Sequence, residues 1–141
     1  MVRSEIDAEL RSAIEDVHST SWAVRAAAGR RLAAAADVAQ AADALYRLLL
    51  DQDTGVTQET AEALLERWDV CGWRLVLAAL VGADDVGTAD QLQAGIDVVC
   101  YGSLANLTRF RVLCAALMSD ADESISEEAS SLLSRWQQPD Q

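Results

Sequence analysis

Few residues in this sequence have types that support catalysis or metal binding. The single histidine, His18, would have to anchor any Ser-His-Asp or Cys-His site, but neither a Gly-x-Ser-x-Gly motif nor a cysteine-protease signature accompanies it. Cys71, Cys100 and Cys114 lack the Cys-x-x-Cys spacing of zinc sites, so we expect reduced thiols in the core. Arginine accounts for all 11 basic residues, which excludes lysine chemistry. We therefore predict no catalytic residue, and a solvated or capping role for His18.

Two acidic segments come close to the calcium-binding loop of EF-hands. Residues 51–62, DQDTGVTQETAE, have Asp at loop positions 1 and 3 and Glu at position 12. However, Val56 occupies position 6, where the sharp turn requires glycine, and Gly55 at position 5 has no side-chain oxygen. Residues 120–131 depart from the pattern at positions 6 and 12. We therefore expect helix caps in both segments, with no bound metal and no other cofactor.

The chain is acidic throughout, with 23 acidic and 11 basic residues and a net charge of −12. Residues 1–70 contain 13 acids and 7 bases, and the remainder contains 10 and 4. A negative field repels phosphate backbones, so we expect a basic protein as partner and no nucleic acid. The most apolar stretch, at 73–82, includes Arg74 and is too short to cross a bilayer. Because the N-terminal segment is unlike a signal peptide, we expect a cytoplasmic protein that does not bind membranes.

One register of residues recurs four times along the chain. Positions 29, 61, 95 and 129 hold Gly, Ala, Gly and Ala, at nearly equal intervals. The sequence Leu-Leu-x-Arg-Trp also occurs twice, at 64–68 and 132–136. Recurrence at intervals of about 20 to 50 residues is typical of repeat proteins, whose units bury apolar residues against each other. The residues predicted to be buried between layers, three positions after each small residue, are Leu32, Leu64, Val98 and Leu132.

The apolar spacing within each unit is helical. Residues 57–68 carry a stripe at i, i+3 and i+4 that ends at Trp68, and no alternating strand pattern competes with it. We expect Trp68 and Trp136 to pack between layers instead of forming an exposed recognition platform. The sequence predicts an all-α fold of eight helices in one domain, 1–141. Its four antiparallel hairpins span about 4–35, 38–68, 72–101 and 103–136, and residues 137–141 form a frayed tail.

The segment WAVRAAAGRRLAA, at 22–34, is similar to the Val-Arg-x-x-Ala-x-x-x-Leu signature of second helices in HEAT repeats. The segment GVTQETAEALLER, at 55–67, is a weaker echo, with Thr57 in place of the signature Arg, and Asp90 replaces the Val in the third unit. Over most of its length the chain thus resembles a HEAT-like, armadillo-type repeat protein. The resemblance implies a right-handed α-solenoid that binds other proteins.

Acidic residues gather on two predicted surfaces. Three hairpin turns each carry two aspartates, and such turns lie along one edge of a stacked array. Further acids lie on the second helices, which solenoids commonly use for binding. The residues predicted to bind a partner are Asp51, Asp53, Asp84, Asp85, Asp120 and Asp122 on the edge, with Glu59, Glu62, Glu66, Asp97 and Glu127 on the face. The alternative is a solvated acidic coat with helix caps. Only the helix with Arg25, Arg30 and Arg31 is locally basic.

Three functions are compatible with this organisation. The leading hypothesis is a non-enzymatic binding module that holds a basic protein, for example an immunity protein or inhibitor that neutralises a basic toxin such as a nuclease. The second is a scaffold or adaptor subunit of a larger assembly, which self-associates through an exposed end layer. The third, a HEAT-like DNA glycosylase, requires a basic concave groove, which a chain of this charge lacks. The sequence leaves the partner's identity and the oligomeric state open.

Overall fold

The structure, a computed structural model, describes residues 2–136, and side chains from residue 7 to residue 135. This part of the chain forms eight α-helices and no strand, which confirms the predicted all-α class and the number of helices. The helices are α1 (Val2–Asp16), α2 (Trp22–Ala33), α3 (Ala39–Leu49), α4 (Thr54–Leu65), α5 (Val70–Gly82), α6 (Val86–Tyr101), α7 (Leu104–Leu117) and α8 (Glu123–Trp136). The predicted frayed tail, 137–141, lies outside the described residues.

Capping residues mark the beginnings of the even-numbered helices. The side chain of Ser21 accepts a hydrogen bond from the backbone N–H of Val24 at the start of α2. Asp53 and Asp85 cap α4 and α6 in the same way. These three caps are evenly spaced along the chain, and so are the first residues of the helices that follow them, at positions 22, 54 and 86. A regular spacing of caps therefore sets the spacing of α2, α4 and α6.

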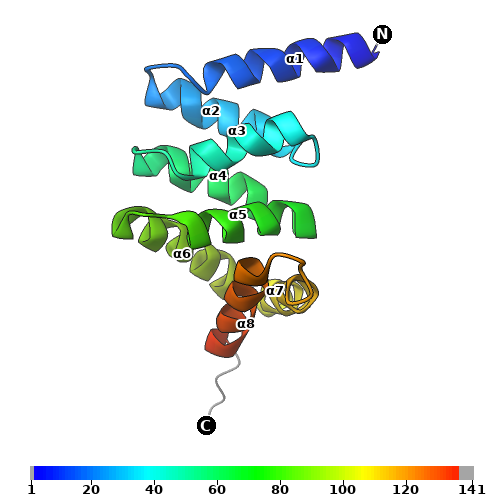
Figure 1. The fold of residues 1–141 in the computed structure, drawn as a ribbon, viewed down its shortest axis with the longest axis vertical. Coiled ribbons are helices and arrows are strands. Elements are labelled where there is room, and N and C mark those ends of the chain that lie inside the picture. Colours follow the sequence, from blue (N-terminus) through cyan, green and yellow to red (C-terminus); the bar gives the residue numbers. More distant parts are fainter. Residues whose placement is uncertain (1, 137–141) are drawn as a thin grey trace.

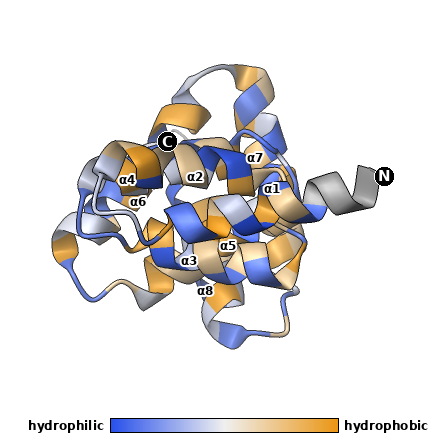
Figure 2. Cartoon of the chain, turned by 90° about the horizontal axis from the view of Figure 1, so that it is seen from above, coloured by the Kyte–Doolittle hydropathy of each residue, from blue (hydrophilic) through white to orange (hydrophobic). Residues whose placement is uncertain are grey.

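The first six helices form successive hairpins that stack along the long axis of the molecule (Figure 1). Helix α2 packs against α4, and α4 packs against α6, so the even-numbered helices form one layer. Helix α3 packs against both α1 and α5 on the other side. Viewed along the stack, hydrophobic and hydrophilic segments alternate along the helices (Figure 2), as expected when each helix buries one face.

The last hairpin is turned relative to the others. Helices α7 and α8 pack against each other, but α8 also packs against α5, and α7 packs against α6. Figure 1 shows α7 nearly end-on, whereas α1 to α6 lie across the view. The regular order of odd-numbered and even-numbered layers therefore ends at α6.

The core between the layers contains most of the residues predicted to be there. Leu32, Leu64 and Leu132 are at most 2% exposed, as predicted. The prediction for Val98 is wrong, because its side chain is 68% exposed. The buried residue at the equivalent place is Ile96, which follows Leu64 at the same interval as Leu64 follows Leu32. The third unit thus keeps the spacing of the caps. The prediction instead aligned Gly95 with Ala61, a longer step, and therefore assigned Val98 to the buried face of α6 by mistake.

Trp68 packs against the core, but it does not continue the helical stripe of α4. The helix ends at Leu65, and Trp68 has a left-handed backbone with φ of 51°. Its ring stacks on the buried Trp73 ring with centroids 5.3 Å apart, and the guanidinium of Arg109 in α7 lies 5.7 Å from the Trp68 ring. The predicted packing role is therefore confirmed for Trp68 through a different backbone geometry. The side chain of Trp136 lies outside the described residues.

Candidate protein-binding surface

The turn between α3 and α4 is held by an internal ion pair. Arg25 Nε donates to Asp51 Oδ2 at 2.9 Å, and Arg25 Nη2 donates to Asp51 Oδ1 at 3.1 Å. Both side chains are largely buried, with 14% and 11% of their area exposed. The Arg25 guanidinium also donates to the Ser19 carbonyl at 3.0 Å, which ties this turn to the preceding one. Asp51 therefore helps to hold two turns of the fold together.

Two further aspartates of the predicted edge, Asp53 and Asp85, also have local roles. Asp53 Oδ1 accepts from the Gly55 backbone N–H at 2.9 Å, and Asp85 Oδ2 accepts from the Thr88 backbone N–H at 3.0 Å. These bonds satisfy N–H groups that a helix start would otherwise leave unpaired. Asp84, beside Asp85, is exposed. The turns at 50–53 and 83–85 lie on the same side of the stack (Figure 1), as predicted.

The third predicted turn does not lie on this edge. Asp120 accepts two hydrogen bonds from Arg74, at 2.7 and 3.1 Å, and Arg74 lies in the first half of α5. Asp84, in contrast, follows the end of α5. Because the last hairpin is turned, the α7–α8 turn lies on the opposite side of the stack (Figure 1). The prediction of one continuous acidic edge is therefore wrong for Asp120 and Asp122, and Asp122 instead caps α8 through the Ser124 N–H.

Ion pairs also neutralise part of the predicted acidic face. Glu59 of α4 pairs with Arg30 of α2. Asp97 of α6 accepts from Arg135 of α8 at 3.0 Å. Glu127 is exposed on α8, which packs against α5 and α7 and does not extend the layer of even-numbered helices. Two members of the face therefore serve mainly to join neighbouring helices.

Glu62, in the last turn of α4, and Glu66, its C-cap residue, differ from these acids. Both are exposed, and neither pairs with a cation within the described part of the chain. Glu62 accepts one hydrogen bond, from Gln58 Nε2 at 3.1 Å. They stand at the end of α4, where the helix dipole disfavours negative charge, and like charges four residues apart repel. Their placement costs the helix stability and brings it no ion pair.

A groove runs between α4 and α6 directly beside these two glutamates. It has a volume of about 290 Å³. Its lining is Gln58, Glu62, Glu66, Gln91, Ala94, Gly95, Val98 and Val99. The exposed Val98 thus gives the groove an apolar surface next to the unpaired carboxylates. Sequence reasoning missed this groove because it placed Val98 in the core, although the even spacing of the caps would have shown the correct face.

The locally basic helix α2 presents little free positive charge. Besides the pairs of Arg25 and Arg30 described above, Arg31 Nη1 binds Asp16 Oδ2 at 3.0 Å. Arg31 also lies 3.6 Å from a carboxylate oxygen of Glu9. These three arginines therefore join α2 to α1, to α4 and to the turn after α3, and their charges are matched within the fold.

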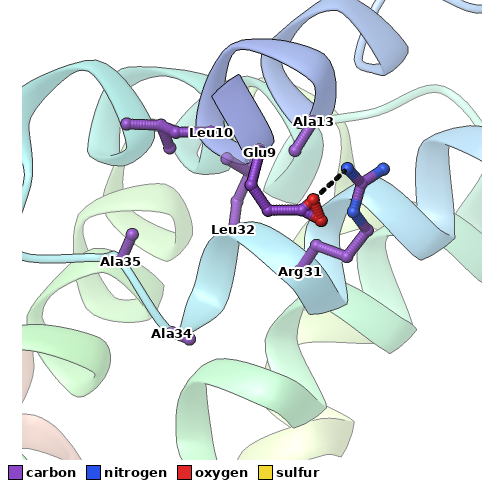
Figure 3. Close-up of a pocket in the computed structure, with 7 residues that line it drawn as sticks. All are labelled: Glu9, Leu10, Ala13, Arg31, Leu32, Ala34 and Ala35. Atoms are coloured by element: carbon purple, nitrogen blue, oxygen red, sulfur yellow. Dashed lines mark ion pairs between the residues drawn. The ribbon is translucent and has the colours of Figure 1, made fainter. Parts of the chain in front are cut away.

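A second hollow, of about 250 Å³, lies between α1 and α2 at the N-terminal end of the stack. Figure 3 shows its residues, with the Glu9 carboxylate directed toward the Arg31 guanidinium at one side. The lining is Glu9, Leu10, Ala13, Arg31, Leu32, Ala34 and Ala35. Apart from this ion pair its surface is apolar, and sequence reasoning did not identify it.

The histidine and the cysteines do not form a reactive cluster. His18 is exposed, and its Nδ1 lies 3.4 Å from Arg47 Nη1. Burial raises the pKa of the Cys100 and Cys114 thiols to about 12, and it raises the pKa of the half-buried Cys71 thiol as well. All three cysteines pack in or against the core, as predicted. Among the described side chains, from residue 7 to residue 135, no group of three His, Cys, Asp or Glu residues is arranged to hold a metal ion.

No described helix is both long enough and apolar enough to cross a bilayer. Comparison with known proteins finds no family, no curated protein and no solved structure that matches the chain.

Proposed function

We propose that the chain is a non-enzymatic binding module that holds a basic protein against the face formed by α4 and α6. The observation that carries the proposal is that Glu62 and Glu66 are exposed beside Val98 and form no ion pair with the described side chains. Most other acids of the predicted surface are matched by an arginine or cap a helix. Residues that break a local rule of helix stability without a compensating ion pair are expected at functional sites. The binding surface is therefore smaller than the whole acidic face.

The architecture that we propose is a HEAT-like α-solenoid. The packing of α2, α4 and α6 in one layer and the even spacing of their first residues support it. The turned last hairpin ends this regular stack and gives the layer a defined limit. In such an array, the second helices present side chains from successive units to a single partner.

A basic toxin is the partner class that fits the charge best. The net charge of −12 attracts a basic protein at long range and raises its association rate. An immunity protein or inhibitor would use this attraction to cover the surface with which the toxic nuclease binds nucleic acid. We further propose a cytoplasmic location, without binding to membranes or nucleic acid.

Affinity purification of the tagged chain from its own cells tests this function. The wild-type chain is compared with Glu62→Lys/Glu66→Lys and with Glu15→Lys/Glu123→Lys, which reverses two exposed acids on α1 and α8. We expect the wild type and the control variant to recover the same basic protein, and the Glu62/Glu66 variant to lose it. Equal recovery by both variants would refute binding at this face, since each changes the net charge equally.

The hollow between α1 and α2 supports a second candidate, a scaffold that self-associates through its N-terminal end layer. Its apolar lining would be covered if two copies met there. Sedimentation over a concentration series tests this function with Ala34→Glu, which places a charge at the exposed rim. Self-association that Ala34→Glu abolishes, and that Ala8→Glu on the exposed face of α1 leaves intact, would favour the scaffold. A monomer at all concentrations would exclude it.

A further inference from the structure

We infer that the groove between α4 and α6 receives an amphipathic basic helix of the partner. This inference rests on the proposed function and specifies what the partner inserts. The helix places two cations, one turn apart, opposite Glu62 and Glu66, and an apolar side chain against Val98. Three features of the groove lead to this occupant, namely its charge, its apolar surface and the spacing of its carboxylates.

The negative charge of the groove is not neutralised by a described arginine of the chain itself. Its polar lining consists of two carboxylates and the neutral side chains of Gln58 and Gln91. Gln91 Nε2 lies 3.5 Å from Gln58 Oε1, so the two amides contact each other across the groove. The arginines that reach this face, Arg30 and Arg135, are already engaged with other acids. A cationic ligand therefore gains two ion pairs here without breaking one.

The apolar part of the groove is contributed by α6. Val98 is 68% exposed, and the small residues Ala94 and Gly95 leave its approach open. A Cβ added at Gly95 would meet only Leu65 Cδ1 at 3.8 Å, so the core does not require glycine at this position. The small residues keep the surface hollow, and an inserted apolar side chain would cover Val98 together with Val99.

The spacing of the carboxylates matches a helical ligand. Glu62 lies in the last turn of α4 and Glu66 is its C-cap residue, with αR backbone, so the two are about one helical turn apart. A ligand helix that lies along the groove repeats its cations at the same interval, with apolar residues between them on the same face. A peptide that binds by strand addition would need an exposed strand edge, and the part of the chain that the structure describes contains no strand.

A designed peptide tests the inference without the natural partner. The probe is a capped, fluorescently labelled peptide of alanine, glutamine, leucine and arginine, with Arg at i and i+4 and Leu between them on one face. A second peptide has the same composition and charge, but its arginines and leucines are dispersed around the helix. Binding of each peptide is measured by fluorescence anisotropy at low and at physiological salt, and the contacted residues are mapped by NMR shifts of the labelled protein.

Three protein variants accompany the two peptides. Glu62→Gln/Glu66→Gln removes the two charges, and Ala94→Trp fills the groove from an exposed position. Glu15→Gln/Glu123→Gln removes two exposed charges elsewhere and is the matched control. We expect the first variant to bind the amphipathic peptide with an affinity about threefold to thirtyfold lower, which is the range expected for the loss of two exposed ion pairs. We expect Ala94→Trp to lower this affinity to a similar extent, and the control to change the affinity by less than about twofold.

The shifts should fall on residues 58–66 and 91–99, and the dispersed peptide should bind more weakly than the amphipathic one. Equal binding of the two peptides, equal weakening by the control pair, or no binding of either peptide would overturn the inference. The proposed function would survive these results if purification still recovered a basic protein that depends on Glu62 and Glu66. If no such protein were recovered, the proposed function itself would fail.

Discussion

Gly29 of α2 lies directly against Thr60 of α4. A Cβ atom added to Gly29 would stand 3.2 Å from Thr60 Cβ and would overlap Thr60 Oγ1. Both residues are buried. The Thr60 hydroxyl has no hydrogen-bond partner within the described part of the chain. The absence of a side chain at position 29 thus lets the first two helices of the even-numbered layer approach closely, and this contact begins the layer that carries the groove.

Substitution Gly29→Ala should destabilise the protein. The overlap costs about 1–3 kcal/mol, which exceeds the gain of up to about 1 kcal/mol in helix propensity. In a Thr60→Ala background the overlapping oxygen is gone, so the cost should shrink by at least about 1 kcal/mol. Urea unfolding of the wild type, both single variants and the double variant measures this. Additive free energies of unfolding would show that the two residues do not contact.

Leu64 and Val98 should respond very differently to truncation. Leu64 is fully buried, so Leu64→Ala should cost about 2–5 kcal/mol in free energy of unfolding. Val98 is exposed, so Val98→Ala should change it by no more than about 0.5 kcal/mol. Urea unfolding of both variants checks the orientation of α6. A large loss for Val98→Ala would mean that the residue is buried, in agreement with the sequence register and against the structure.

Stability should fall in acid. Hydrogen bonds from Arg74 lower the pKa of Asp120, and those from Arg67 lower the pKa of Asp69. A carboxyl whose pKa is lower in the folded state stabilises it above the ordinary pKa of about 3.9, and this contribution disappears as pH falls through the folded-state pKa. Urea unfolding between about pH 6 and pH 2.5 should show the loss, and Arg74→Gln should make it shallower.

The control for this pH dependence is Arg11→Gln. Arg11 is exposed and forms no ion pair with the described side chains, so its substitution should leave the pH profile unchanged. If Arg74→Gln left the profile unchanged too, the pair of Arg74 and Asp120 would not contribute to stability.

The three thiols should differ in reactivity. Cys100 and Cys114 are buried, and a pKa of about 12 leaves almost no thiolate at neutral pH. Cys71 is half-buried and should react slowly with a thiol reagent in the native protein. We expect one thiol to react in buffer and three in urea, with none reacting in native Cys71→Ser. Reaction of native Cys100 or Cys114 at the rate of Cys71 would contradict the described burial.

Local signals in the sequence predicted the helices well. Asp53 caps α4 within the segment 51–62, where a helix cap was predicted, and the apolar spacing identified Leu32 and Leu64 as buried. The error at Val98 arose because the small residue Gly95 was aligned with the small residues of other units, although the caps define a different register. Capping is set by the backbone of a single turn, whereas a small residue is also accepted at an exposed position.

Long-range pairing could not be predicted in the same way. Arg25 in α2 meets Asp51 in the turn between α3 and α4, and Arg74 in α5 meets Asp120 in the turn between α7 and α8. Whether such charges meet depends on how far one hairpin rotates against the next, and the sequence spacing of a repeat does not specify that rotation. The turned last hairpin moved Asp120 away from the predicted edge. For the same reason, sequence reasoning could not separate Glu62 and Glu66 from the acids that are paired within the fold.

The most direct test of the central claim is the association rate of the recovered basic protein with the chain. The rate is measured at low and at high salt for the wild type, Glu62→Lys/Glu66→Lys and Glu15→Lys/Glu123→Lys. Charge steering predicts a wild-type rate that falls steeply with salt, because screening shortens the range of the attraction. The Glu62/Glu66 variant should associate at least about tenfold more slowly at low salt, and the control should remain close to the wild type. An association rate that changes neither with salt nor with the Glu62/Glu66 reversal would contradict binding at this surface.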